Sequence, residues 1–174
     1  TDALLKEVDV LVSLDTGATS YSVFDMLHNM RKFDDATFVH CLNVSLICTV
    51  LAKWLKLSPE DVRLASLCGM LHDIGRFEQL RNYGTFIDAQ SIDHALYGAS
   101  ILFDEGKIQD YLEQPSEEVC DFLRRVISCH SAYRVPEEYD KRTRMFVDIL
   151  RDADKIDILK VNIEVPLEEI YNVT

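Results

Sequence analysis

The sequence lacks several patterns that define common classes of protein. No run approaches the ~18 consecutive apolar residues of a membrane-spanning helix, and no secretory signal is visible. The cysteines show no Cys-x-x-Cys spacing and lie in apolar segments, so we expect reduced core residues, with a redox or zinc-thiolate role as the minor alternative. These absences favour a soluble, cytoplasmic protein. The five cysteines are Cys41, Cys48, Cys68, Cys120 and Cys129.

Glycine-rich nucleotide-binding patterns are also missing. The chain has no Rossmann or Walker glycine motif, no Gly-x-Ser-x-Gly elbow, no internal repeat and no low-complexity tract. No stretch alternates apolar and polar residues as a half-buried strand does. With 174 residues, 48% hydrophobic and 28% charged, the chain is long enough to bury a core. We therefore predict an all-α fold, a single compact helical bundle.

Positive charge is scarce relative to negative charge. Eighteen Lys and Arg residues stand against thirty Asp and Glu residues, which gives a net charge of −12 and a pI near 4.7. Sequence-independent binding to nucleic acid or to an anionic membrane needs clustered Lys and Arg, so neither partner is expected. A small phosphorylated substrate is still compatible with this charge, because a bound dication reverses the local field.

Amphipathic spacing and cap residues predict a succession of helices. Ser58-Pro59-Glu60-Asp61 and Pro115-Ser116-Glu117-Glu118 are strong helix starts, and Ser91 is the expected cap of a third helix. Residues after Arg76, through about 91, are rich in turn and polar residues and are expected to form a loop beside the site. The expected helices are 2–14, 20 or 22–30, 34 or 35–56, one that starts at 58 or 59 and ends within 67–76, 91–103, 115–130 and 141–160, with a loop at 162–166 and a helix start at 167–171. Residues 1–33 are expected to pack as N-terminal helices on a core domain of 34–160, and 161–174 form a C-terminal segment.

The rest of the chain is organised around Leu67-Cys68-Gly69-Met70-Leu71-His72-Asp73-Ile74-Gly75-Arg76. An apolar helical run ends in the adjacent pair His72 and Asp73, and Gly75 follows where a helix usually stops. Buried polar groups are costly unless they are paired or bound. A divalent metal offsets this cost, since imidazole and carboxylate are both ligands of first-row metals. The alternative is a histidine at a helix end beside a solvated aspartate.

The remaining histidines strengthen the metal hypothesis. His40 shares a helix face with apolar residues at i+4, i+7 and i+11, so it is expected to face the interior. His94 and His130 follow in order along the chain, whereas His28 lies far from every motif and is left out of the site.

Three acids near the C-terminus compete for a role as metal ligand. Asp148 and Asp152 share a face with Arg151 and Lys155 and are expected to be solvated. Asp154 instead shares a face with apolar residues, where a carboxylate requires a cation. We therefore choose Asp154, with Asp152 as the alternative.

The order His, then His-Asp, then Asp resembles the HD-domain superfamily of metal-dependent phosphohydrolases over about residues 38–160. The Ala153-Asp154-Lys155-Ile156 segment is similar to the family's last aspartate motif, which also favours Asp154. The resemblance implies a metal site of His40, His72, Asp73 and Asp154. His94 and His130 fall where subgroups with two metals have additional histidines, so they are candidates for a second metal or for a supporting role. A Gly-Tyr-Pro segment, typical of the branch that hydrolyses cyclic dinucleotides, is missing.

This resemblance implies an enzyme that hydrolyses a phosphate ester of a small nucleotide or another phosphorylated metabolite, using water activated by a metal. The mixed N and O ligands suit one or two Mn, Fe, Co, Ni, Zn or Mg ions. Asp73 is expected to orient the nucleophile, and Arg76 and Lys155 to neutralise the phosphate. The alternative is a non-catalytic nucleotide-binding sensor on the same scaffold, and oxidative chemistry at a di-iron site is a third option. A homo-oligomer is compatible with the sequence.

Overall fold

A computed structural model describes residues 35–164, and within this range the chain is helical, with no strand. The all-α prediction is confirmed. The helices expected at 2–14, 20–30 and 167–171, together with His28, lie outside the described residues. The α-helices are α3 (Asp35–Trp54), α4 (Pro59–Leu71), α5 (Ile74–Tyr83), α6 (His94–Ala99), α7 (Glu117–Ser128) and α8 (Lys141–Glu164). Short 3-10 turns lie at Asp88–Gln90 and Lys107–Asp110, and a π-helical turn at Ser100–Asp104 extends α6.

Helix starts follow the cap residues of the sequence with one exception. Ser58 Oγ accepts the Asp61 N–H at 3.1 Å and begins α4, while Ser116 Oγ accepts the Val119 N–H at 3.3 Å and begins α7. The expected cap of α6 was Ser91, but the side chain of Asp93 caps the helix instead by accepting the Leu96 N–H at 2.9 Å. Ser91 Oγ is already engaged with Gln79 and with the carbonyl of Ile87, so the helix starts later than predicted.

Two predicted irregular segments are helical in the structure. Gly75 does not stop a helix, because α5 begins at Ile74 and continues to Tyr83. The expected loop therefore shortens to residues 84–93, which contain only a 3-10 turn. Helix α8 continues to Glu164, so the loop predicted at 162–166 is also wrong over its first residues. Polar residues misled the prediction after Arg76, because the end of α5 is exposed to solvent and needs no apolar residues.

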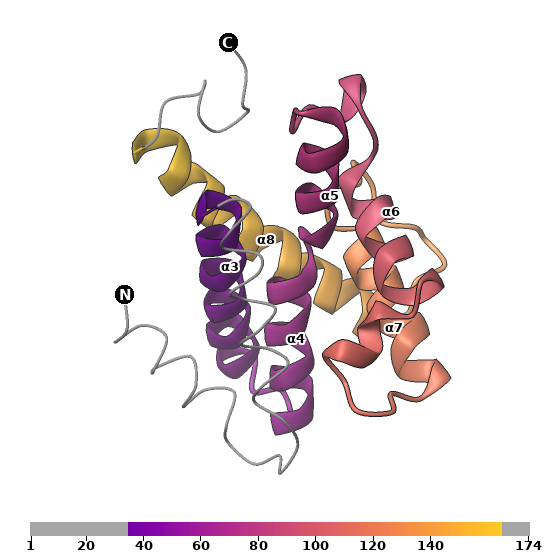
Figure 1. Cartoon of the computed structure of the whole chain (residues 1–174). Helices are drawn as coiled ribbons and strands as arrows, with labels where there is room; N and C mark the ends of the chain where they lie inside the picture. Colours follow the sequence, from indigo (N-terminus) through magenta and orange to yellow (C-terminus); the bar gives the residue numbers. More distant parts are fainter. Residues whose placement is uncertain (1–34, 165–174) are drawn as a thin grey trace.

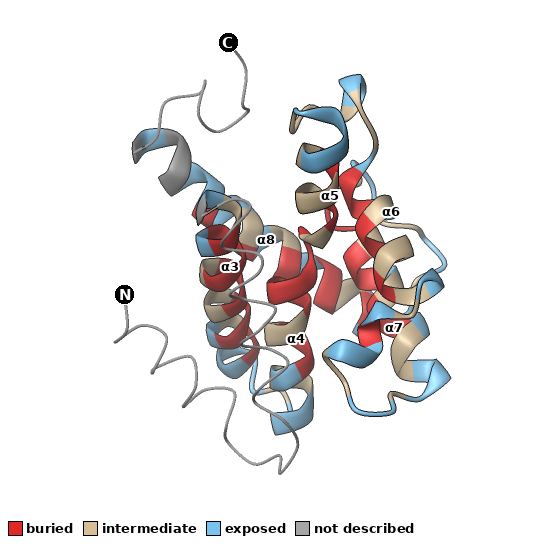
Figure 2. Cartoon of the chain, in the orientation of Figure 1, coloured by how far each residue is buried: buried red, intermediate tan, exposed pale blue. Residues whose placement is uncertain are grey.

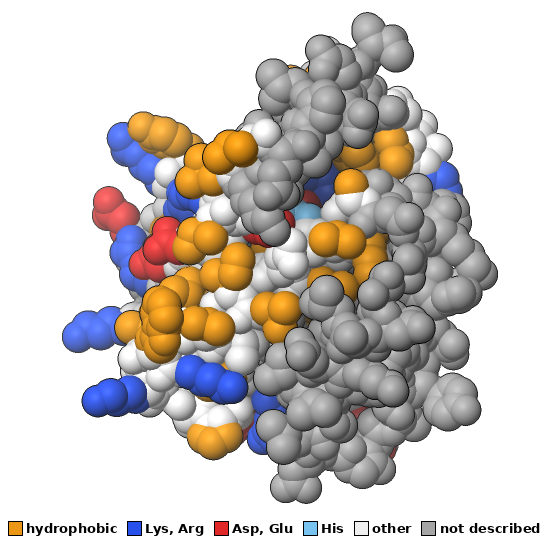
Figure 3. All heavy atoms as spheres, turned by 90° about the vertical axis from the view of Figure 1, so that its left-hand side faces the viewer, with side chains coloured by type: hydrophobic (Ala, Val, Ile, Leu, Met, Phe, Trp, Pro, Cys, Tyr) orange, Lys and Arg blue, Asp and Glu red, His pale blue; other side chains and the backbone are white. Residues whose placement is uncertain are grey.

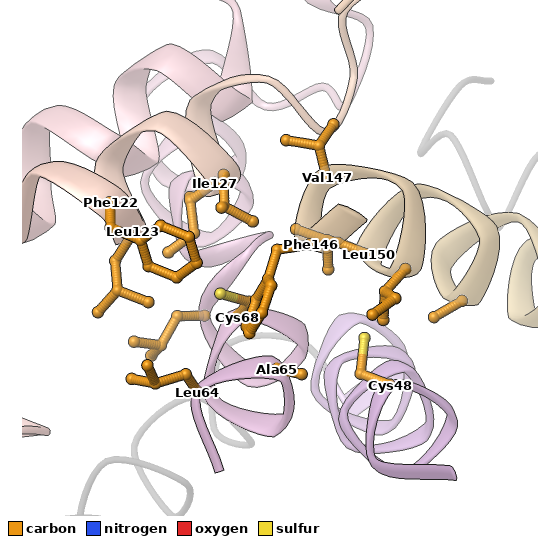
Figure 4. Close-up of a cluster of buried hydrophobic side chains, with 14 of the residues drawn as sticks. Cys48, Leu64, Ala65, Cys68, Phe122, Leu123, Ile127, Phe146, Val147 and Leu150 are labelled. Atoms are coloured by element: carbon orange, nitrogen blue, oxygen red, sulfur yellow. The ribbon is translucent and has the colours of Figure 1, made fainter. Parts of the chain in front are cut away.

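The helices form a bundle in two parts that meet near the end of α4 (Figure 1). Helices α3, α4 and α8 pack together on one side, and α5, α6 and α7 lie on the other. Buried residues follow the inner faces of both parts (Figure 2). The core fills the space between α3, α4, α7 and α8, as Figure 4 shows. Its members include Cys48, Leu64, Cys68, Leu123, Phe146 and Leu150.

Helix α3 is unusually apolar. Residues Ala36–Trp54 have a mean hydropathy of 1.5, which satisfies the length and composition test for a membrane span, although polar residues interrupt the apolar run. Core helices pass the same test, and α3 packs against both α4 and α8. Its inner face belongs to the bundle core, because Val44, Cys48 and Ala52 are fully buried.

Candidate metal centre

Four imidazole rings form a row where the two parts of the bundle meet. Ring centroids are 5.2 Å apart between His40 and His72, 4.9 Å between His72 and His130, and 5.1 Å between His130 and His94. His40 comes from α3, His72 follows α4, His130 follows α7, and His94 begins α6. Segments spread over ninety residues of sequence therefore place their histidines side by side, and all four are buried.

Each imidazole donates its Nδ1–H away from the centre of the row. His72 Nδ1 lies 2.8 Å from the carbonyl oxygen of Gly69, and His130 Nδ1 lies 2.7 Å from that of Ile127. A carbonyl only accepts, so both Nδ1 atoms carry a proton. The outer rings instead face carboxyl groups of side chains: His40 Nδ1 lies 2.7 Å from Asp157, and His94 Nδ1 lies 2.7 Å from Asp88. All four Nε2 atoms consequently point inward.

Asp73 lies between two pairs of histidines and offers one oxygen to each. Its Oδ2 is 3.9 Å from His40 Nε2 and 3.7 Å from His72 Nε2. Its Oδ1 is 3.3 Å from His94 Nε2 and 3.5 Å from His130 Nε2. We call His40, His72 and Asp154, with Asp73 Oδ2, the His40 group, and His94 and His130, with Asp73 Oδ1, the His94 group.

Of the three competing acids, only Asp154 reaches the cluster. Its Oδ1 lies 3.0 Å from His40 Nε2 and 3.6 Å from His72 Nε2. Asp148 and Asp152 are exposed on the opposite side of α8, as their spacing with Arg151 predicted. The same helix brings a further acid, Asp157, to the other nitrogen of His40.

The donor set fits a cation. His72 Nε2 is completely buried and has no hydrogen-bond partner among the described residues. Because its Nδ1 holds the proton, this atom presents a lone pair to the centre of the cluster, where an unsatisfied acceptor is costly. The Nε2 atoms of His94 and His130 face each other at 3.1 Å beside Asp73 Oδ1, so two imidazole nitrogens and one carboxylate oxygen converge there too. Groups of this kind hold metal ions in proteins.

Electrostatics keep the carboxylates ionised. Burial raises the pKa of Asp73 and of Asp154, but neighbouring histidines outweigh it, and both pKa values fall below their usual range. Burial lowers the pKa of His40, but hydrogen bonds with Asp154 and Asp157 raise it to about 10. Without a metal, His40 is therefore an imidazolium held between two carboxylates, and an ion has to displace its Nε2 proton.

The two histidines of the His94 group shift in opposite directions. Burial lowers the pKa of His94, and Arg76 adds to this effect. Burial also opposes protonation of His130, but the hydrogen bond and charge of Asp73 raise its pKa. Of these two histidines, His130 is therefore the one that more readily takes up a second proton in the absence of metal.

Three residues of the site were missed by sequence reasoning. Asp157 and Asp88 accept from the two outer histidines, and Gln79 is fully buried beneath the loop. Gln79 Nε2 lies within 3.0 Å of Asp88 Oδ1, Ser91 Oγ and the Ile92 carbonyl oxygen. The only sequence signal for Asp157 was its place three residues after Asp154, on the same helix face. Asp88 and Gln79 lay in the segment that was predicted to be irregular.

Of the two predicted phosphate-binding residues, only Arg76 lies at the cluster. Its Nε is 3.7 Å from Asp73 Oδ2, and its Nη1 donates to Gln79, the Phe86 carbonyl and Asp88. Lys155 is exposed, and no hydrogen bond or ion pair within residues 35–164 joins it to the cluster. Lys155 lies next to Asp154 in sequence, but the helix turns it away.

Close packing of two helices brings His94 to Asp73. A Cβ at Gly75 would overlap the carbonyl oxygen of His94 and approach Gly98 N at 2.7 Å. The backbones of α5 and α6 therefore touch at Gly75 and Gly98. This contact brings His94, at the start of α6, directly beside Asp73. Gly75 serves this approach rather than helix termination.

The site has one side open to solvent. Side chains of Asp154 and Arg76 keep 17% and 22% of their accessible surface, whereas His72 keeps none. In the side view of Figure 3, a histidine is visible at the surface between acidic and basic side chains, with hydrophobic side chains around them. A small molecule can therefore approach the cluster from this face.

Comparison with known proteins assigns the family. The HD-domain family model matches residues 37–159, which span α3 to α8 and include every residue of both groups. The chain belongs to the HD-domain family, whose members are in general metal-dependent phosphohydrolases that bind divalent metals. No curated protein and no solved structure matches the chain significantly.

Proposed function

We propose that this protein hydrolyses a phosphate ester of a small nucleotide or another phosphorylated metabolite in a metal-dependent reaction. One observation carries the proposal: four buried Nε2 atoms and three carboxylate oxygens converge, and His72 Nε2 has no partner there among the described residues. A site that only stabilised the fold would have paired these groups with donors.

The His40 group would hold one divalent ion through His40, His72, Asp73 and Asp154, and the His94 group a second through His94, His130 and Asp73. Such ions lower the pKa of water toward neutrality and polarise a phosphoryl oxygen. The mixed nitrogen and oxygen ligands suit Mn, Fe, Co, Ni, Zn or Mg.

The chain's own residues bind and orient the reactants. Asp73 has a depressed pKa and stays ionised at neutral pH, so it serves as a ligand and accepts a hydrogen bond from the attacking water. Arg76 Nε lies 3.7 Å from Asp73 Oδ2, so the guanidinium would neutralise a phosphoryl group bound beside Asp73. Hydrolysis then forms a bond from the water oxygen to phosphorus and breaks the ester P–O bond, and the leaving oxygen gains a proton.

Lys155 is not carried into this mechanism, because it is exposed and turned away from the cluster. The acidic surface supports a small-molecule substrate rather than a nucleic acid or an anionic membrane. A cytoplasmic location is consistent with five cysteines that form no disulfide within residues 35–164, four of which are buried.

Phosphate release tests the proposal directly. The metal-free protein is reconstituted with Mn, Co or Zn and assayed with p-nitrophenyl phosphate, bis-p-nitrophenyl phosphate and a panel of mononucleotides. We expect turnover in the wild type and at least a hundredfold loss in His72→Ala and Asp73→Ala, with Asp148→Asn as an exposed control. Equal turnover in all four proteins would refute the proposal. Nucleotide-induced stabilisation without any turnover would instead support the sensor.

A further inference from the structure

The two outer histidines of the row are each held by a carboxylate, whereas the two inner ones are held by backbone. Asp157 accepts from His40 Nδ1, and Asp88 accepts from His94 Nδ1, both at 2.7 Å. His72 and His130 donate to carbonyls three residues earlier in their own helices. The inner rings are thus fixed by helix geometry, but the outer rings depend on side chains from elsewhere in the chain.

Asp157 is built into the structure for this contact. It is 3% exposed, and its second oxygen accepts from Asn43 Nδ2 at 2.9 Å, so both oxygens are engaged. Asn43 lies three residues after His40 in α3. The pair therefore clamps Asp157 against one face of α3, and Asp157 fixes the Nδ1–H tautomer of His40.

Asp88 is held by a separate network. Its Oδ1 accepts from Gln79 Nε2 at 2.8 Å and from Arg76 Nη1 at 3.1 Å, which leaves Oδ2 for His94. Gln79 is fully buried, although its amide is polar, and its only described contacts are within this network and the following loop. The network links α5 and the 84–93 loop to His94 and does not touch His40 or Asp157.

We propose that Asp157 and Asp88 are positioning residues for two separate metal positions, Asp157 acting through His40 and Asp88 acting through His94. Each carboxylate holds a proton on Nδ1, so that Nε2 is the nitrogen directed at its own group and available to a metal ion. Loss of such an outer partner lowers metal affinity about 10- to 100-fold in other metal sites. This inference rests on the proposed function, because it requires that the cluster binds metal.

The test measures metal binding rather than activity. Metal-free wild type, Asp157→Asn, Asp88→Asn and the exposed control Asp148→Asn are titrated with Co²⁺, followed by absorbance and by elemental analysis after dialysis. We expect two ions per chain in the wild type and the control. Each of the other variants should lose 10- to 100-fold affinity for one ion and retain the other.

Double variants identify which ion each carboxylate controls. Asp157→Asn should add little to His40→Ala but should add fully to His94→Ala, and Asp88→Asn should show the reverse. Far-UV circular dichroism of the metal-free variants checks that each is folded. Loss of both ions in either single variant, or no change in either, would overturn this inference alone. No metal bound by the wild type would overturn the proposed function as well.

The outer face of α3 supports a second, independent inference. Residues 36–52 contain no Asp, Glu, Lys or Arg, and Val39, Val50 and Trp54 are 50%, 43% and 75% exposed. Together with Leu46 they form one stripe along the helix, which we call the outer α3 stripe. Figure 3 shows hydrophobic side chains gathered on this side of the molecule. Such a stripe is normally covered.

We infer that residues 2–14 of the same chain dock on the outer α3 stripe. These residues carry Leu4, Leu5, Val8, Leu11 and Val12 at helical spacing. Residues 15–34 connect them to the start of α3, which is ample length for the chain to fold back. A helix of thirteen residues is about 20 Å long, and the stripe from Val39 to Trp54 spans about 22 Å, so one helix can cover most of the stripe.

Photo-crosslinking of the full chain identifies what covers the outer α3 stripe. Val50→p-benzoylphenylalanine is irradiated, and the crosslinked peptides are identified by mass spectrometry, with Leu96→p-benzoylphenylalanine on α6 as the exposed control. We expect crosslinks from Val50 to residues 2–14 of the same chain and none of these from Leu96. Crosslinks between two chains would assign the stripe to a second copy. Either that result or no crosslink to residues 2–14 would overturn this inference.

Discussion

Metal binding should compete with a proton on His40, and the competition gives a quantitative prediction. In the metal-free protein, hydrogen bonds with Asp154 and Asp157 raise the pKa of His40 to about 10. At pH 7 this proton must be removed from a group that titrates about three units higher, which costs roughly 4 kcal/mol at about 1.36 kcal/mol per unit. The apparent dissociation constant should therefore fall about tenfold per pH unit between pH 7 and 9.

Isothermal titration calorimetry measures the same proton directly. Titrations of Mn²⁺ or Zn²⁺ at pH 8 in buffers of different ionisation enthalpy give the number of protons released. We expect at least one proton per chain, with a further contribution from His130, whose pKa is also raised. His40→Gln removes the titrating group, so in this variant the pH dependence should weaken along with the affinity. An affinity independent of pH between 7 and 9, with no proton released, would refute this account of the His40 group.

Thermal stability should depend on pH in opposite directions in the metal-free and the metal-loaded protein. A raised pKa in the folded state means that His40 stabilises the metal-free fold fully below pH 6.5, and that this contribution disappears as the pH rises toward 10. The loaded form gains affinity over the same range. The difference in Tm between loaded and EDTA-treated protein should therefore widen from pH 6.5 to pH 9, and a constant difference would contradict the prediction.

Four further substitutions separate the site from the fold. Asp154→Asn should lower metal affinity at least tenfold, while Asp152→Asn should leave it unchanged, as measured by metal titration; equal effects would contradict the choice of Asp154. Leu150→Ala removes a fully buried side chain and should cost about 2–5 kcal/mol in urea unfolding, and a cost below 1 kcal/mol would show that the core does not depend on it. Gly75→Ala should cost about 1–3 kcal/mol, because the added Cβ overlaps the carbonyl of His94. An unchanged stability would show that α5 and α6 do not touch there.

Local signals were sufficient for most of the fold. Ser58 and Ser116 cap the helices that they were predicted to cap, because a side-chain oxygen three residues before a free N–H acts locally. Segment 74–83 was missed because Gly75 was interpreted by its usual role after a helix. Its actual role, the contact with α6, depends on a partner almost twenty residues away and leaves no local pattern.

The residues of the site likewise divide into those that local sequence signals predict and those that they do not. His40 and Asp154 could be placed by periodicity, because each was a polar residue on an apolar helix face. Asp157, Asp88 and Gln79 could not, since their significance comes from the atoms they face. A carboxylate that accepts from an imidazole looks, in sequence, like any surface aspartate.

The positions of the four histidines along the chain explain why two of them are held by backbone carbonyls and two by carboxylates. His72 and His130 each follow a helix end, where carbonyls three residues earlier are free to accept, so the helix itself fixes their rings. His40 lies inside α3 and His94 at the first position of α6, where the main chain offers no free carbonyl to the ring. Both therefore require a carboxylate from another segment. The same reasoning predicts that Ile127→Val will not release His130, because the acceptor is a backbone atom, whereas a single side-chain change at Asp157 or Asp88 frees an outer ring.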